Sequence, residues 1–252
     1  RVATYSWGGE MAETVQAKVN SLGLALEAGE LEASEVTELP GIVDDWAIKN
    51  NEECYKMGAS NFRDVPMHDW FYASAQWNSN NQYIKGYGGD RAGEYGPGNV
   101  TLKIEALAIL MRMFDLPQGN ASQLDVAAVG VPDWGYGYVN GAKDFVNLGW
   151  RWGEPITRME SAKLIRAVLM ATGDNLYTQP VDVGGVQKYP DYSSMKADKD
   201  GVWAVEFLTD AGIFKGAGDG NFYPNNSLVR SEFGALNQRL FENYLDGETL
   251  SQ

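Results

Sequence analysis

Three short segments of the chain place a basic residue two positions before a glutamate, each at the start of an expected amphipathic helix. They read Lys103-Ile-Glu105, Arg158-Met-Glu160 and Arg230-Ser-Glu232. A cation in the first turn of a helix faces the positive end of the helix dipole, which costs about 0.3 to 1 kcal/mol at an exposed site. Either the nearby glutamate neutralises the cation, or the cation and the helix N-terminus together bind an anionic ligand group. Both explanations stay open on these residues alone.

The segments that precede these helix starts also repeat. Phe62-Arg-Asp-Val-Pro66 corresponds to Val131-Pro-Asp133 and to Tyr189-Pro-Asp191, and each is followed by an apolar helical pattern and a turn. Asp64 lies 39 residues before Lys103, and Asp191 lies 39 residues before Arg230. The middle copy is shorter, with 25 residues over the same interval. This period indicates three helix-loop-helix repeats.

The helix that closes each repeat carries its apolar residues on one face. The stripes are Ile104, Leu107, Leu110, Met111 and Phe114; Met159, Ala162, Ile165 and Leu169; and Phe233, Leu236, Leu240 and Tyr244. A single helix of this kind does not bury its stripe alone, so we expect the three to pack around a shared core. Thr157 and Glu160 also predict a capping box at the second helix start.

The composition excludes several classes of protein. The chain has 20 Lys and Arg against 34 Asp and Glu, a net charge of −14, which argues against nucleic acid as a partner. Without a run of about 18 apolar residues, membrane insertion is not expected. Cys54 and His68 occur once each, so nucleophilic and metal chemistries are poorly supplied. We therefore expect no cofactor, no bound metal and no enzymatic activity. A chain that begins at Arg1 is also expected to have lost a leader or a larger N-terminal portion.

The third copy contains Gly-Ile-Phe-Lys-Gly216, Gly-Asp-Gly-Asn-Phe-Tyr-Pro224 and Val-Arg-Ser-Glu232. These motifs resemble the S-layer homology (SLH) repeat, whose pattern includes F-x-D-V-P, G-I-I-x-G, G-D-G-x-F-x-P and an I-T-R-A-E helix start. The first copy is similar at Phe62 to Pro66, at Trp70 and at Tyr83-Ile-Lys-Gly86, and the second at Ile156-Thr-Arg-Met-Glu160. The resemblance covers about residues 61 to 245.

The resemblance implies an all-α fold in which three SLH repeats pack as a pseudo-threefold helical bundle. We expect repeat 1 at residues 61–118, a shortened repeat 2 at 119–175 and repeat 3 at 176–252. Residues 1–60 lie before the resemblance, and their periodicity predicts an N-terminal helical segment with an acidic outer face.

The resemblance also implies a function. SLH repeats anchor bacterial surface or S-layer proteins non-covalently to an anionic secondary cell-wall polysaccharide, which often carries pyruvate ketals and lies in grooves between repeats. The implied location is extracellular, at the cell wall or in the S-layer, with wall polysaccharide and other surface-protein chains as partners. A different class stays open: a structural protein whose repeats mediate protein–protein assembly at the cell surface without binding glycan.

The arginine of the helix-start motif is the ligand contact in this family. By position, that role falls to Arg158, Arg230 and Lys103. Lysine lacks the planar guanidinium group of arginine, so we expect the site at Lys103 to bind more weakly. Two aromatic residues, Trp70 and Trp203, are candidates either for stacking on sugar rings or for packing. The supporting motif residues are Asp64, Asp191, Glu105, Glu160, Glu232, Gly218, Asp219 and Gly220. The second copy lacks the Gly-Asp-Gly turn.

Overall fold

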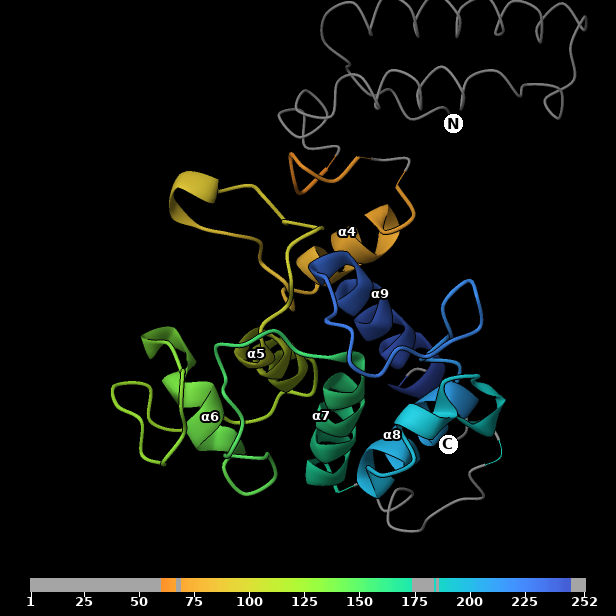
Figure 1. Ribbon diagram of the computed structural model, residues 1–252. Helices are drawn as coiled ribbons and strands as arrows, with labels where there is room; N and C mark the ends of the chain where they lie inside the picture. The colour runs from red at the N-terminus through yellow and green to blue at the C-terminus, as the bar shows by residue number, and fades with distance from the viewer. Residues whose placement is uncertain (1–59, 67–68, 174–183, 185, 246–252) are drawn as a thin grey trace, which may run out of the picture. The chain divides into compact units, whose positions relative to one another are not determined.

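The computed structural model describes residues 60–66, 69–173, 184 and 186–245 (Figure 1). The chain divides into two compact units. Arg1–Gln76 and Gly86–Tyr95 form the first, and Trp77–Lys85 and Gly96–Gln252 form the second. The predicted N-terminal helical segment lies outside the described residues, apart from Ser60 at its end.

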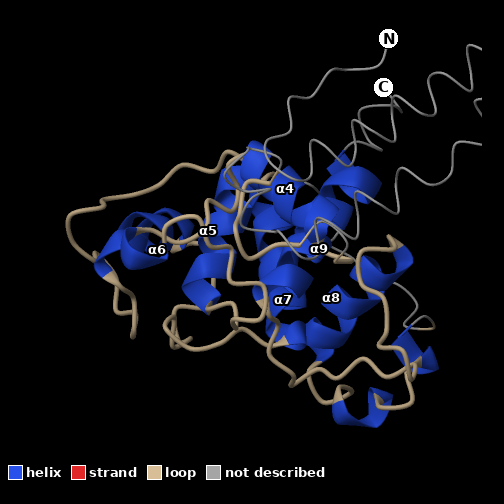
Figure 2. Cartoon of the chain, turned by 90° about the horizontal axis from the view of Figure 1, so that it is seen from above, coloured by secondary structure: helices blue, strands red, loops and turns tan. Residues whose placement is uncertain are grey.

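The regular structure of the described residues is helical. The α-helices are α4 (Tyr72–Asn80), α5 (Lys103–Met113), α6 (Tyr136–Ala142), α7 (Arg158–Ala171), α8 (Lys199–Asp210) and α9 (Arg230–Leu240), with short 3-10 or π turns between and after them. Figure 2 shows these helices joined by loops, with no strand drawn in the described part of the chain. The all-α prediction is confirmed. None of the described helices combines the length and apolar character needed to cross a bilayer.

The three closing helices begin at the cations that the sequence singled out, because α5 starts at Lys103, α7 at Arg158 and α9 at Arg230. The predicted apolar residues that lie inside these helices are buried, whereas Phe114 follows the end of α5 and is only half-buried. Examples are Leu107 in α5, Ile165 in α7 and Phe233 in α9, each 0% exposed. Helix α5 packs against α6 and α7, and α7 packs against α8 (Figure 1). Removing such a side chain to alanine costs about 2 to 5 kcal/mol in a packed core.

The extended segments before the three closing helices meet in a closed cycle of backbone hydrogen bonds. The amide of Thr101 donates to the carbonyl of Leu228 at 2.8 Å, that of Leu228 to Ile156 at 3.0 Å, and that of Ile156 to Thr101 at 2.9 Å. All three residues are fully buried, where an unpaired backbone group would be costly. The cycle brings the three helix starts together. Packing of all three whole repeats as a pseudo-threefold bundle stays a prediction, since part of repeat 1 belongs to the first unit.

The first helix of the second repeat, α6, is short and lies very close to the preceding loop. A Cβ atom on its Gly141 would lie 2.3 Å from the carbonyl oxygen of Pro117. The approach therefore requires glycine at this position, and α6 itself has 7 residues.

Candidate ligand-binding site

The closing helices share one arrangement at their N-termini. The residue before each helix, Leu102, Thr157 or Val229, is extended, and its amide donates to the helix-start glutamate at 2.9, 2.9 and 3.1 Å. At α7 the Oγ1 atom of Thr157 also accepts from the amide of Glu160 at 3.2 Å, so the predicted capping box is confirmed. Leucine and valine have no side-chain acceptor, so the other two helices keep only half of this arrangement.

Two of the three helix-start cations are buried and paired with a glutamate from another repeat. Lys103 Nζ lies 2.9 Å from Glu160 Oε1, and the Lys103 side chain is 8% exposed. Arg230 Nη1 lies 3.0 Å from Oε1 of Glu105, and the Arg230 side chain is 7% exposed. Each glutamate therefore caps its own helix with one oxygen and neutralises the cation of a different helix with the other. The neutralising partner is not the glutamate two positions along the chain.

The third helix-start cation, Arg158, is held by backbone carbonyls instead of a glutamate. Its Nε donates to the carbonyl of Phe222 at 2.6 Å, and its Nη2 donates to the carbonyl of Lys215 at 3.1 Å. The guanidinium lies over the Phe222 ring, 4.9 Å from the centroid. Among the described residues, no carboxylate oxygen lies within 4.0 Å of it. Arg158 is a cation held by neutral groups.

The electrostatic surroundings of Arg158 agree with this geometry. Burial lowers the pKa of Arg158 below its ordinary value, and the charge of Glu232, with smaller contributions from Tyr189 and Asp191, opposes that shift. Burial outweighs the surrounding negative charge, so a closer anion would be favourable. Arginine remains protonated at physiological pH even so.

A cavity of about 470 Å³ lies beside Arg158. Its lining includes Lys188, Tyr189, Phe214, Lys215, Gly216 and Gly220. Arg158 contacts two of these residues, because it bonds the Lys215 carbonyl and lies 5.5 Å from the centroid of the Phe214 ring. The cavity combines buried aromatic rings with lysine side chains and an exposed glycine-rich backbone. Such a surface offers apolar contact, hydrogen bonds and positive charge together, as a site for an anionic saccharide requires.

The last residue of the Gly-Asp-Gly turn, Gly220, lines this cavity. Gly220 has φ of +86°, a conformation that side chains rarely adopt. Asp219 accepts from the amide of Asn221 at 3.0 Å and from the hydroxyl of Tyr223. The Tyr223 bond is the main cause that holds the pKa of Asp219 below its ordinary value. Gly218 is exposed in the same turn.

Asp64 and Asp191, which occupy the same position in their repeats, make the same kind of hydrogen bond. Asp191 accepts from the amide of Phe222 at 2.9 Å, and Asp64 accepts from the amide of Tyr95 at 2.7 Å. Both aromatic residues are fully buried. Each aspartate therefore ties the opening of its repeat to the turn before the closing helix, once in each unit.

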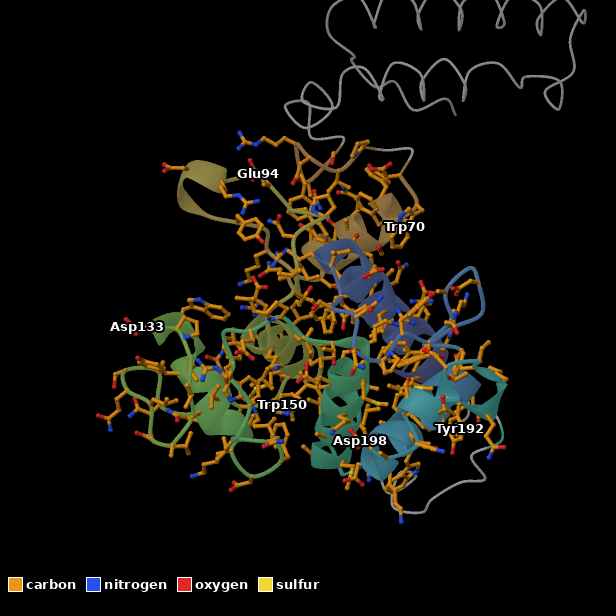
Figure 3. All side chains as sticks on the ribbon, viewed as in Figure 1. Trp70, Glu94, Asp133, Trp150, Tyr192 and Asp198 are labelled. Carbon is orange, nitrogen blue, oxygen red and sulfur yellow. The ribbon has the colours of Figure 1, made fainter. Side chains whose placement is uncertain are left out.

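The two tryptophans lie outside the lining of the cavity. Trp70 belongs to the first unit, where its side chain is 68% exposed and packs edge-on against Phe71 (Figure 3). Trp203 in α8 lies under the guanidinium of Arg166, 3.6 Å from the ring centroid. One face of Trp203 is thus covered by a neighbouring helix. A sugar-stacking role for either residue stays a prediction.

The groups that hold Arg158 were not found by sequence reasoning. They are the backbone carbonyls of Lys215 and Phe222, which every residue possesses and which leave no sequence signal. The aromatic positions were the only available indication. Phe214 and Phe222 occupy the third-copy motifs, and their rings are the ones that Arg158 overlies.

Comparison with known proteins places the third repeat in a family. Residues 197–233 match the sequence model of the S-layer homology domain. Over 81 residues the chain is 35% identical to cell surface glycoprotein 1 of Acetivibrio thermocellus, a match that covers 32% of this chain and 3% of the length of that relative. The match identifies residues 197–233 as part of an S-layer homology domain. The matched residues include α8, the Gly-Asp-Gly turn and the start of α9.

Proposed function

We propose that the repeat region, about residues 61 to 245, is a non-catalytic anchoring module. It holds a bacterial surface protein to the cell wall by binding an anionic wall polysaccharide. It acts outside the cell, at the wall or in the S-layer. The S-layer homology match at residues 197–233 and the similarity to a cell surface glycoprotein support this proposal. Other chains of the surface layer are the expected neighbours of the anchored protein.

The observation that carries the proposal is the absence of an acidic partner within 4.0 Å of Arg158 among the described residues. A carboxylate of the polymer, such as that of a pyruvate ketal, would supply the missing partner beside the cavity. A hydrogen bond to a charged group contributes about 1.5 to 3 kcal/mol. The buried rings and the lysines of the lining would contact the sugar that bears the carboxylate.

Lys103 and Arg230 would have to exchange a glutamate partner for the ligand, because Glu160 and Glu105 already neutralise them. We therefore propose that Arg158 contributes the largest share of the affinity. In this proposal Lys103 and Arg230 act mainly by fixing the helix starts around the central cycle.

The test is a calorimetric titration of the chain with purified wall polysaccharide, before and after chemical removal of its acidic substituents. Arg158→Gln should weaken binding roughly 10- to 150-fold. Arg151→Gln is the matched control, because Arg151 is 68% exposed and pairs only with Glu154 among the described residues. It should bind like the parent, and circular dichroism should show both variants folded.

Equal affinity of Arg158→Gln and the parent would refute the site. If the parent binds neither form of the polymer but associates with surface-protein chains, the repeats serve protein assembly instead. Binding that survives removal of the acidic substituents would refute the role of the carboxylate.

A further inference from the structure

A second cavity, of about 320 Å³, lies at the other end of α5 from the helix start. Its lining includes Tyr83, Lys85, Arg112, Asp115, Gln118 and Tyr138. These residues come from the loop after α4, from the C-terminal end of α5 and the loop that follows, and from α6. It shares no lining residue with the cavity beside Arg158. Its volume is at the lower end of the range for small-molecule sites.

Arg112 is the arginine among the residues that line this cavity. Its Nε donates to the hydroxyl of Tyr138 at 2.9 Å, and its Nη1 donates to the carbonyl of Tyr83 at 3.0 Å. The guanidinium also lies 5.2 Å from the centroid of the Tyr138 ring. These two bonds use two of the five N–H groups that an arginine carries. The remaining groups have no carboxylate partner within 4.0 Å among the described residues.

Two neutral partners thus fix the orientation of a planar cation without neutralising it. A guanidinium held in this way is pre-organised for a carboxylate, which it can bind through two parallel hydrogen bonds. Lys85 adds a second positive charge at the cavity. Because the partners of Arg112 are uncharged, an incoming carboxylate would not have to displace an acidic side chain.

The other lining groups indicate what kind of molecule carries the carboxylate. Gln118 supplies an amide that both donates and accepts, Asp115 supplies carboxylate acceptors, and Tyr83 supplies a phenol. Such a mixture suits the hydroxyl groups of a sugar ring better than the apolar side chain of a simple organic acid. Asp115 would also disfavour a ligand that is negatively charged throughout.

An exposed tryptophan packs against one of the residues that line this cavity. Trp134 is 53% exposed, and its ring packs edge-on against that of Tyr138, with 6.3 Å between the centroids. Aromatic faces that remain open to solvent bind the apolar faces of sugar rings. Trp134 is therefore the candidate contact for a sugar that adjoins the one in the cavity.

We infer that the cavity around Arg112 is a separate subsite for a saccharide unit bearing a carboxylate, with Trp134 contacting the adjoining sugar. The inference rests on the proposed function for the choice of a saccharide as ligand. Arg112, Lys85 and Tyr138 belong to none of the repeated helix-start motifs, so this subsite is independent of the helix-start cations.

The test uses methyl glucuronide as the probe and methyl glucoside as its neutral counterpart, with binding followed by calorimetry and by amide chemical shifts. The glucuronide should bind at least about tenfold more tightly, since the charged hydrogen bonds are lost with the neutral sugar. Arg112→Lys keeps the charge but loses the planar guanidinium that can bind a carboxylate through two hydrogen bonds. It should reduce glucuronide affinity by about tenfold. Tyr138→Phe should do the same more weakly, because the ring stays in place.

Lys85→Gln should weaken glucuronide binding. Lys143→Gln is the control and should not, because Lys143 is exposed and is not among the residues that line either cavity. Trp134→Ala should weaken binding of an acidic oligosaccharide while leaving methyl glucuronide unaffected.

Equal binding of the two probes, or a folded Arg112→Lys variant with unchanged affinity, would overturn the inference. So would a glutamate-rich peptide that displaces the glucuronide at equal concentration. Failure of this subsite can be distinguished from failure of the proposed function. If wall polymer binding falls in Arg158→Gln but not in Arg112→Lys, the anchoring function stands and this subsite does not.

Discussion

Replacing Arg230 with methionine tests whether the helix-start cations hold the fold together. The substitution keeps an apolar side chain of similar length but leaves Glu105, 18% exposed in its side chain, without the cation 3.0 Å away. Glu105 must still accept the amide of Leu102 to cap α5. Removing one partner of a buried ion pair costs about 3 to 5 kcal/mol, because the remaining charge is left uncompensated.

For a domain of this size, that loss lowers the melting temperature by roughly 6 to 20 °C. Urea unfolding followed by circular dichroism measures the free energy directly. Arg151→Met is the control, because the exposed pair of Arg151 with Glu154 should contribute no more than about 1 kcal/mol. Adding Glu105→Gln to Arg230→Met should recover part of the loss, since the uncompensated charge is then removed.

The same variant separates a structural role from a ligand contact. Well below its melting temperature, Arg230→Met should bind wall polymer within about twofold of the parent, a difference of less than about 0.5 kcal/mol. A free energy of unfolding within 1 kcal/mol of the parent's, combined with a large loss of polymer affinity, would refute the reasoning. It would show instead that Arg230 meets the ligand and that Glu105 does not depend on it.

Two hydrogen bonds at other helix starts allow further tests. Thr157→Ala removes the side-chain cap of α7 and should cost about 0.5 to 2 kcal/mol in urea unfolding, whereas Thr157→Ser should cost little. Asp198 caps α8 and accepts from Lys163 Nζ at 2.8 Å (Figure 3). Burial favours a higher pKa for Asp198, but the bonds from Lys163 and Gly201 together lower it below 3.8. The ionised form therefore stabilises the fold above that pH, and the stabilisation is lost as pH falls through the lower folded value. Unfolding between about pH 2 and pH 6 should depend less on pH in Asp198→Asn than in the parent; an identical dependence would contradict the assignment.

Local sequence signals predicted the helix starts well. The cap at Thr157 and Glu160 involves residues three apart, and each closing helix begins at its predicted cation. The repeat spacing also put Asp64 and Asp191 at the same position of their repeats, and both accept from the amide of a buried aromatic residue. These features depend on neighbours in the chain or on motifs that recur.

The partners of the cations could not be predicted in the same way. A helix-start glutamate has two carboxylate oxygens. The local sequence predicts the bond of one oxygen to the residue before its own helix, but not the partner of the other. The other oxygen of Glu105 reaches Arg230, which is 125 residues away. Trp203 is a similar case, because the guanidinium that covers it comes from Arg166 in a neighbouring helix. Arg112 has no motif at all, and only the fold reveals that its partners are uncharged.

The hydrogen-bonded cycle of Thr101, Ile156 and Leu228 joins the segments before the three closing helices into a closed set. In an open solenoid, each new repeat adds to an exposed end, and the array can lengthen or shorten by whole units. A cycle of three donors and three acceptors has no such end, because every amide and carbonyl in it is already used. A fourth repeat could join only by breaking the ring, and deleting one repeat would leave a buried donor and a buried acceptor unmatched. Larger anchors of this kind should therefore grow by adding complete triplets, not single repeats.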